Sequence, residues 1–193
     1  EAIIDREYPL SPAEALRAHR ILGEFRQAQS FEDVYRAIGA TYLVDHTGKN
    51  ALIQGEGLFD VIVSFHVLEH VRRENVAEHL AGCARLLKPG GYQIHQIGID
   101  DHLAHYDRAA HVKSYLQFSE KTWRTWFEND LQYINRIQLS EWLARFQATG
   151  MTLVHLEAQE CDVSGLDIHP EFADLEARDL KCTIPTVVLR KPG

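Results

Sequence analysis

Residues 59–97 carry the clearest pattern of the chain, because their periodicity changes from strand to helix and back to strand. Residues 61–63 form an unbroken run of β-branched apolar side chains, which is typical of a strand covered on both faces of a parallel sheet. Apolar side chains then recur at helical spacing, at Val76, Leu80, Cys83 and Leu87. A lysine, a proline and two glycines at 88–91 end this helix, and residues 92–97 follow as a second strand. The pattern predicts a right-handed βαβ unit.

The flanking sequence predicts more elements of both kinds. Ser11, Pro12 and Glu14 form a capping box with a proline at the first helical position. Gly39 and Gly150 each follow an apolar helical pattern and mark its end. The expected ranges are a strand at 2–4, helices at 13–26 and 30–38, a strand at 40–44, a helix at 140–148, and strands at 151–158 and 182–190. Strands and helices in this order predict an α/β fold.

Length and composition narrow the class of protein. With 193 residues, of which 45% are hydrophobic, we expect a single domain over 1–193. A net charge of −8 without a basic cluster argues against nucleic acid as a partner, since phosphates are bound by Lys and Arg. No bilayer-spanning apolar run or leader is present, so we expect a cytoplasmic protein without a membrane partner. The three dispersed cysteines suggest neither disulfides nor a thiolate metal site.

Two motifs of the βαβ unit point to a family. The segments FDVIVS…VLEHV, at 59–71, and RLLKPGGY, at 85–92, resemble the second half of a class I S-adenosylmethionine-dependent methyltransferase. Their order, their spacing and the helix between them all match. The resemblance runs over nearly the whole chain and implies a Rossmann-like, mostly parallel sheet with an antiparallel C-terminal hairpin. The family's first strand and glycine-rich loop have no counterpart here, so we expect an N-terminally truncated fragment that begins before the family's second strand and holds its second to seventh strands.

The resemblance implies S-adenosylmethionine as cofactor and assigns four residues to it. Asp5 closes the expected first strand of the chain, where it would bind the ribose hydroxyls. Asp45 closes the next expected strand and would face the adenine. Ser64 and His66 leave the strand that begins at residue 59 and should border cofactor and substrate. An aspartate at a strand end is also a common turn residue, so capping is the alternative for Asp5.

Three residues are expected on the reaction side. His70 follows His66 by four residues and would act as a base or pack in the structure, with equal weight on each role. Asp100 and His102 follow the second strand of the βαβ unit and should reach the same rim. We interpret residues 100–139 as a substrate-side insertion or lid. Arg136 would hold an anionic substrate or form a solvent-facing ion pair.

The predicted function is methyl transfer to a small-molecule or sugar-type acceptor, with no metal. One alternative is a degenerate, non-catalytic methyltransferase fold that acts as a scaffold, which the absent glycine-rich loop favours. A second alternative is a zinc hydrolase, because His66-Val67-Leu68-Glu69-His70 fits the HxxEH pattern. That pattern requires a helix around the whole motif, whereas here it begins at the end of a strand.

Overall fold

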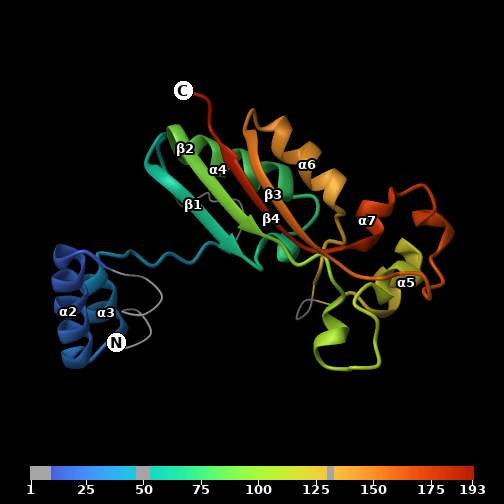
Figure 1. Cartoon of the computed structure of the whole chain (residues 1–193), viewed down its shortest axis with the longest axis horizontal. Coiled ribbons are helices and arrows are strands. Elements are labelled where there is room, and N and C mark those ends of the chain that lie inside the picture. Colours follow the sequence, from blue (N-terminus) through green and yellow to red (C-terminus); the bar gives the residue numbers. More distant parts are fainter. Residues whose placement is uncertain (1–9, 47–52, 130–132) are drawn as a thin grey trace. The chain divides into compact units, whose positions relative to one another are not determined.

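The computed structural model describes residues 10–46, 53–129 and 133–193. Two compact units divide the chain, Glu1–Val44 and Asp45–Gly193, and each is described by itself. Figure 1 shows helices α2 and α3 in the first unit and a sheet with helices in the second. Within the described ranges no helix is long and apolar enough to cross a membrane. Asp5 and the expected strand at 2–4 lie outside the described residues.

The first unit contains the two helices that the sequence predicts. Helix α2 (Pro12–Gln27) begins with the full capping box, since Ser11 and Glu14 each accept a hydrogen bond from the other's backbone N–H. Helix α3 (Phe31–Ile38) ends at Gly39, which has a φ of 69°. Both predicted helices are confirmed.

The strand expected at 40–44 is wrong, because these residues have no regular structure. No described strand pairs with them, and a strand without a neighbouring ladder leaves its backbone groups unsatisfied. Tyr42, Leu43 and Val44 are exposed, so the apolar run does not enter a core. Asp45 follows this segment and therefore does not close a strand.

The second unit is built on one open sheet with the strand order β1-β2-β4-β3. Its strands are β1 (Phe59–Phe65), β2 (Leu87–Gln96), β3 (Thr152–Glu160) and β4 (Cys182–Arg190). Strand β1 runs parallel to β2, and β4 is antiparallel to both β2 and β3. The α/β class and the antiparallel C-terminal hairpin are confirmed. The described sheet is mixed and holds four strands, where six were expected.

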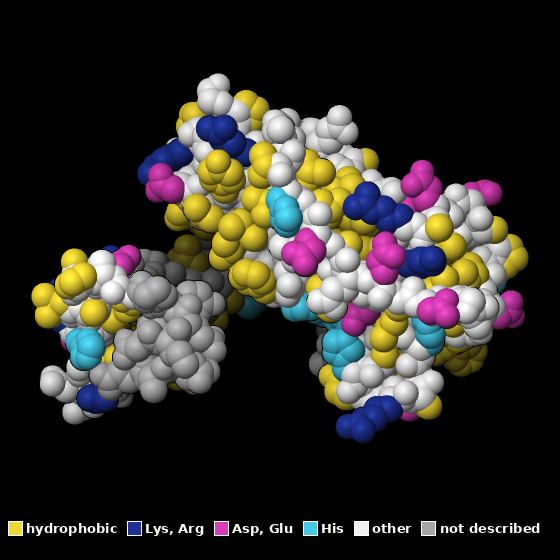
Figure 2. Space-filling model, viewed as in Figure 1, with side chains coloured by type: hydrophobic (Ala, Val, Ile, Leu, Met, Phe, Trp, Pro, Cys, Tyr) yellow, Lys and Arg dark blue, Asp and Glu magenta, His cyan; other side chains and the backbone are white. Residues whose placement is uncertain are grey.

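Helix α4 (Val76–Leu86) joins β1 to β2 as predicted, and its apolar face is buried. Helix α6 (Leu139–Ala148) packs beside it on the same face of the sheet, and Trp142 and Phe146 are fully buried there. The other face bears exposed side chains of β1, with Val61, Val63 and Phe65 each about half exposed. Apolar side chains gather over this face of the strands in Figure 2. Within the second unit β1 is therefore covered on one face only and not on both as expected, because the described helices of this unit pack on that face.

A second, smaller core joins the segment that follows β2 to the segment between β3 and β4. It contains the 3₁₀ turns η2 (His102–His105), η3 (Ser114–Gln117) and η4 (Pro170–Phe172), helix α5 (Glu120–Trp126) and helix α7 (Ala177–Lys181). Tyr115, Leu116, Trp123 and Ile134 form its buried centre. Residues 100–139 are thus anchored by a core that they share with Leu166, Phe172 and Leu180, and their role as a lid remains a prediction.

Strand β2 leaves no room for a side chain at Gly91. A Cβ there would lie 2.9 Å from the carbonyl oxygens of Asp60 and Lys88, which are both backbone atoms. We expect Gly91→Ala to lower the free energy of unfolding by about 2 kcal/mol through this overpacking. Urea denaturation would measure it, with Gly165→Ala as control because nothing lies within 4 Å of that position. Equal unfolding midpoints for the two variants would contradict the prediction.

Candidate functional site

The carboxyl ends of β1 and β2 lie side by side, because the two strands are parallel and in register up to Phe65 and Gln96. His66 follows β1 and donates its backbone N–H to the carbonyl of Gln96 at 2.9 Å. Its φ of 52° is rare for a residue with a side chain, and such backbone strain concentrates at functional sites. The candidate site is therefore the edge where residues 66–70 and 97–105 meet.

The turn η1 (Leu68–His70) is held in place by the segment that begins at Tyr133. Asn135 donates from its side chain to the carbonyls of Leu68 (2.8 Å) and Val71 (3.1 Å), and its backbone N–H donates to the carbonyl of Glu69 (2.8 Å). The ring of His70 bonds through Nδ1 to the carbonyl of Tyr133 at 2.8 Å. These bonds fix the direction in which the side chains of the turn point.

Two carboxylates are buried at this edge. Glu69 is 2% exposed, and burial raises the pKa of its carboxyl. Its Oε1 lies 3.3 Å from Nδ1 of His66, and the backbone N–H groups of Glu69 and Gly98 offset part of this rise in pKa, although no described residue donates a well-aligned hydrogen bond to either oxygen. Asp100 is also buried, and its Oδ2 lies 2.7 Å from Nε2 of His105. A Cβ at Gly98 would lie 2.8–3.1 Å from Glu69, Asp100 and His66, so this convergence requires a glycine.

Three histidine rings follow one another along the same edge. The rings of His70 and His102 are 5.0 Å apart, and those of His102 and His105 are 5.4 Å apart. Turn η2 presents the latter two and is capped by Asp101, whose side chain accepts the N–H of Leu103 at 2.9 Å. Burial lowers the pKa of His102, and the neighbouring His70 lowers it further. The structure thus brings together the three predicted reaction-side residues, His70, Asp100 and His102.

Within the part of the chain that the structure describes, one group of side chains could hold a metal ion. It consists of Glu69, His70 and His102, which each offer a ligand atom within 4.8 Å of the others. Glu69 and His105 were not predicted as site residues. Glu69 stands inside the HxxEH pattern, so its residue type was a usable signal, whereas nothing in the sequence marked His105 over its neighbours.

The predicted cofactor residues are distributed differently. His66 lies at the site, but the Ser64 hydroxyl is 2.7 Å from Nδ1 of the buried His95, on the helix-covered side of the sheet. Asp45 lies in the irregular segment after α3, at the boundary of the two units. The cofactor roles of Ser64, His66 and Asp45 remain predictions, and Asp5 lies outside the described residues.

The HxxEH motif does not have the geometry of a zinc peptidase. His66 directly follows strand β1, and Glu69 and His70 lie in the single turn η1. The motif is therefore not carried on one helix, which that family requires. Glu69 approaches His70 and His102 as a possible ligand, whereas the pattern assigns it to water activation. The structure argues against the hydrolase alternative.

Apolar side chains line a hollow of about 350 Å³ next to His102. Phe118, Trp123, Phe127 and Ile134 contribute to its wall, while Asp101 and His102 supply polar groups. A concave apolar surface with few polar groups is the usual form of a small-molecule site. The aromatic residues of the segment therefore belong partly to the second core and partly to this wall.

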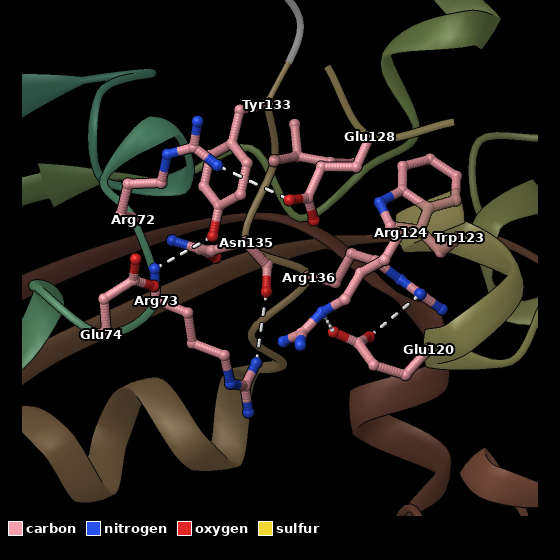
Figure 3. A pocket seen from close by; sticks show the side chains of 11 residues that line it. Arg72, Arg73, Glu74, Glu120, Trp123, Arg124, Glu128, Tyr133, Asn135 and Arg136 are labelled. Carbon is pink, nitrogen blue, oxygen red and sulfur yellow. Dashed lines mark hydrogen bonds and ion pairs between the residues drawn. The ribbon is translucent and has the colours of Figure 1, made fainter. Parts of the chain in front are cut away.

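A second pocket, shown in Figure 3, is rich in arginine. Each of its arginines already has an acidic partner: Arg72 with Glu128, Arg73 with Glu141, and Arg124 and Arg136 with Glu120. The side chain of Arg136 is 3% exposed and donates to the carbonyls of Tyr115 and Phe118. Arg136 thus forms an ion pair, which was one of its two expected roles. Its own side chain is buried and cross-links the second core, while its partner Glu120 is about half exposed.

A family model described as a methyltransferase domain matches residues 10–170. The ubiquinone biosynthesis O-methyltransferase of Caulobacter vibrioides is 47% identical over 45 residues, which are 23% of this chain and 17% of that protein. The match therefore spans less than a fifth of this curated relative.

Two solved structures illustrate the structural similarity. A SAM-dependent methyltransferase from Methanosarcina mazei is 14% identical with a TM-score of 0.49, over 79% of this chain and 68% of that chain. The 1,6-didemethyltoxoflavin-N1-methyltransferase of Burkholderia thailandensis is 12% identical with a TM-score of 0.49, over 86% of this chain and 57% of that chain. The latter structure contains 1,6-didemethyltoxoflavin and S-adenosylhomocysteine.

Proposed function

Because this chain belongs to the methyltransferase-domain family, we propose that it transfers a methyl group from S-adenosylmethionine to a small-molecule acceptor of the sugar or metabolite type. The observation that carries the proposal is the gathering of His70, Asp100 and His102 at the carboxyl ends of β1 and β2. In a parallel α/β arrangement, ligands bind at this edge of the sheet. The net charge of −8 disfavours a nucleic-acid acceptor and leaves a small molecule as the preferred class.

Methyl transfer from a sulfonium chiefly requires alignment. The methyl group passes in line from sulfur to the acceptor atom, the S–CH₃ bond electrons stay on the sulfur, and S-adenosylhomocysteine leaves. A hydroxyl or protonated amine acceptor must also lose a proton to a base. Nδ1 of His70 faces a carbonyl, which can only accept, so this nitrogen carries the proton of the neutral ring. The lone pair of Nε2 is then the group of His70 that can receive a proton.

The acceptor would enter through the apolar hollow beside His102. Asp100 would keep the His105 ring in place through their 2.7 Å contact. On the cofactor side, Asp5 would bind the ribose, Asp45 the adenine, and the backbone around Ser64 and His66 would border the reacting centre.

We expect Asp5→Ala and Asp45→Ala to weaken the binding of S-adenosylhomocysteine ten- to a hundredfold. Each would remove a charge-assisted hydrogen bond, which contributes about 1.5–3 kcal/mol. Isothermal titration of the protein measures the affinity. Asp60→Ala is the matched control, because Asp60 binds Lys88 at the opposite end of β1 from the site.

Two results would count against the proposal. If the protein binds neither S-adenosylmethionine nor S-adenosylhomocysteine, the methyltransferase proposal fails and a non-catalytic scaffold takes its place. If Asp60→Ala weakens binding as much as the two other variants, the assignment of Asp5 and Asp45 to the cofactor fails.

A further inference from the structure

We propose that Glu69, His70 and His102 form a binding site for a divalent transition-metal ion, with zinc as the best-matched ion. The three side chains follow two neighbouring parallel strands, and their ligand atoms lie within 4.8 Å of one another. Ligand atoms around tetrahedral zinc lie about 3.4 Å apart, so the ion would draw the groups together by at most about 1.4 Å. Side-chain rotations accommodate a change of this size.

The buried carboxylate of Glu69 is the first observation that points to a cation. It is 2% exposed, and although the backbone N–H groups of Glu69 and Gly98 lie near it, neither of its oxygens accepts a well-aligned hydrogen bond from a described residue. A buried charge without a hydrogen-bonded partner costs several kcal/mol. The Nδ1 atom of His66, at 3.3 Å, partly offsets this cost, and a metal ion would satisfy the carboxylate more completely.

The orientation of His70 is the second observation. Its Nδ1–H donates to the carbonyl of Tyr133, which leaves the Nε2 lone pair available to a ligand. Histidines that bind metals commonly donate their other ring nitrogen to a carbonyl or carboxylate in this way. Asn135 fixes the same turn through three further bonds, so the ring is held before any ion arrives. With a metal bound, this lone pair would be occupied and His70 would not serve as a base.

The ligand types and the exposure decide which ion fits. Two imidazoles and one carboxylate suit zinc and other transition metals, whereas magnesium and calcium prefer sites made of oxygen alone. Glu69 is buried, while His70 is exposed and His102 is half-buried. Three protein ligands that open toward solvent leave a fourth position for water or for an oxygen of a bound molecule.

Metal binding by the protein tests the inference directly. After treatment with a chelator, we expect one equivalent of Zn²⁺ to bind in a calorimetric titration and to raise the thermal unfolding midpoint. Co²⁺ in the same site should give visible absorption bands that Zn²⁺ abolishes. Absence of stoichiometric Zn²⁺ binding, or displacement of the ion by Mg²⁺ at equal concentration, would overturn the inference.

Variants then identify the ligands. Glu69→Gln and His102→Asn should each weaken Zn²⁺ binding at least tenfold. His105→Asn is the control, because its ring lies 5.4 Å from His102 and pairs with Asp100 outside the three-residue group. Loss of affinity in this control to the same extent would overturn the assignment. Glu69→Gln keeps the size of the side chain and removes a buried charge, so we expect it to fold.

These results separate the metal site from the proposed methyl transfer. Zn²⁺ titration needs neither cofactor nor acceptor. A protein that binds Zn²⁺ but not S-adenosylhomocysteine would support the metal site and contradict the proposed function, and the reverse result would contradict the metal site alone.

Discussion

Replacing Arg136 by Met is expected to lower the free energy of unfolding by about 3 kcal/mol, chiefly because one buried and one partly buried carbonyl lose their donor. The guanidinium donates to the carbonyls of Tyr115 (2.8 Å) and Phe118 (3.0 Å) inside the second core. It also lies 4.9 Å from the ring of Trp123 and 5.0 Å from that of Phe172, at distances typical of cation–π contacts. Met keeps an apolar stem of similar length, so the change isolates the charged head.

Arg124→Met provides a matched control for this prediction. Arg124 and Arg136 bind the same carboxylate, that of Glu120, as Figure 3 shows. The side chain of Arg124 is 62% exposed, against 3% for Arg136, and exposed ion pairs contribute about 0–1 kcal/mol. Chemical denaturation of both variants measures the difference. Equal losses of stability would show that the buried carbonyl contacts of Arg136 contribute nothing beyond the ion pair.

Local signals were sufficient where the structure depends on neighbours in sequence. The capping box at Ser11, the stop at Gly39 and the helical spacing from Val76 to Cys83 each describe contacts within a few residues. These predictions are confirmed because cap hydrogen bonds and an apolar helix face are encoded locally. The two apolar runs also predicted strands β3 and β4, while their antiparallel pairing was expected from the family resemblance.

Local sequence patterns were insufficient to predict features that depend on partners far away in the chain. The run at 61–63 predicts burial on both faces, but burial is set by which helices cover the sheet, and the described helices of the second unit cover one face. The run at 40–44 has the composition of a strand, but no described strand lies beside it. A β-strand requires a ladder partner, which composition alone cannot supply.

At the candidate site, too, some features were predictable from the local sequence and others depend on residues far apart in the chain. Parallel β1 and β2 predict that residues after each strand meet, and His70, Asp100 and His102 do lie at one edge. The burial of Glu69 and the carbonyl of Tyr133 behind His70 were not predicted, because the two segments are more than 60 residues apart in sequence. The side chain of Ser64 was expected at this edge, but its hydroxyl bonds to His95 on the core side of β1.

His95 should make the protein less stable as the pH falls from about 6.5 toward 4. Burial, aided by the charge of His79, lowers the pKa of this ring from 6.5 to about 4. Its Nε2 bonds to the side-chain oxygen of Gln93 at 2.9 Å and its Nδ1 to the hydroxyl of Ser64, while the ring stacks on Phe146. The folded state therefore holds the neutral ring, with both nitrogens satisfied and little room for a charge.

The sign and size of the effect follow from this difference in pKa. Between about pH 4 and 6.5 the unfolded chain binds a proton at His95 that the folded protein does not, so stability rises with pH across this window. The lowered pKa of His95 corresponds to a contribution of about 3 kcal/mol to the free energy of unfolding. This contribution is present above pH 6.5 and is lost as the pH falls through 4. Urea unfolding at a series of pH values would measure this loss.

Carboxylates also titrate as the pH falls, so the test compares variants at each pH. We expect His95→Gln to be less stable than the wild type at pH 7 and to lose less stability on acidification, because Gln can pair with Ser64 but binds no proton. His155→Gln is the control, since the side chain of His155 is 58% exposed on β3. The prediction is contradicted if the free energy of unfolding of His95→Gln depends on pH as steeply as that of the wild type and of His155→Gln. The burial of a neutral His95 would then not cause the loss of stability at low pH.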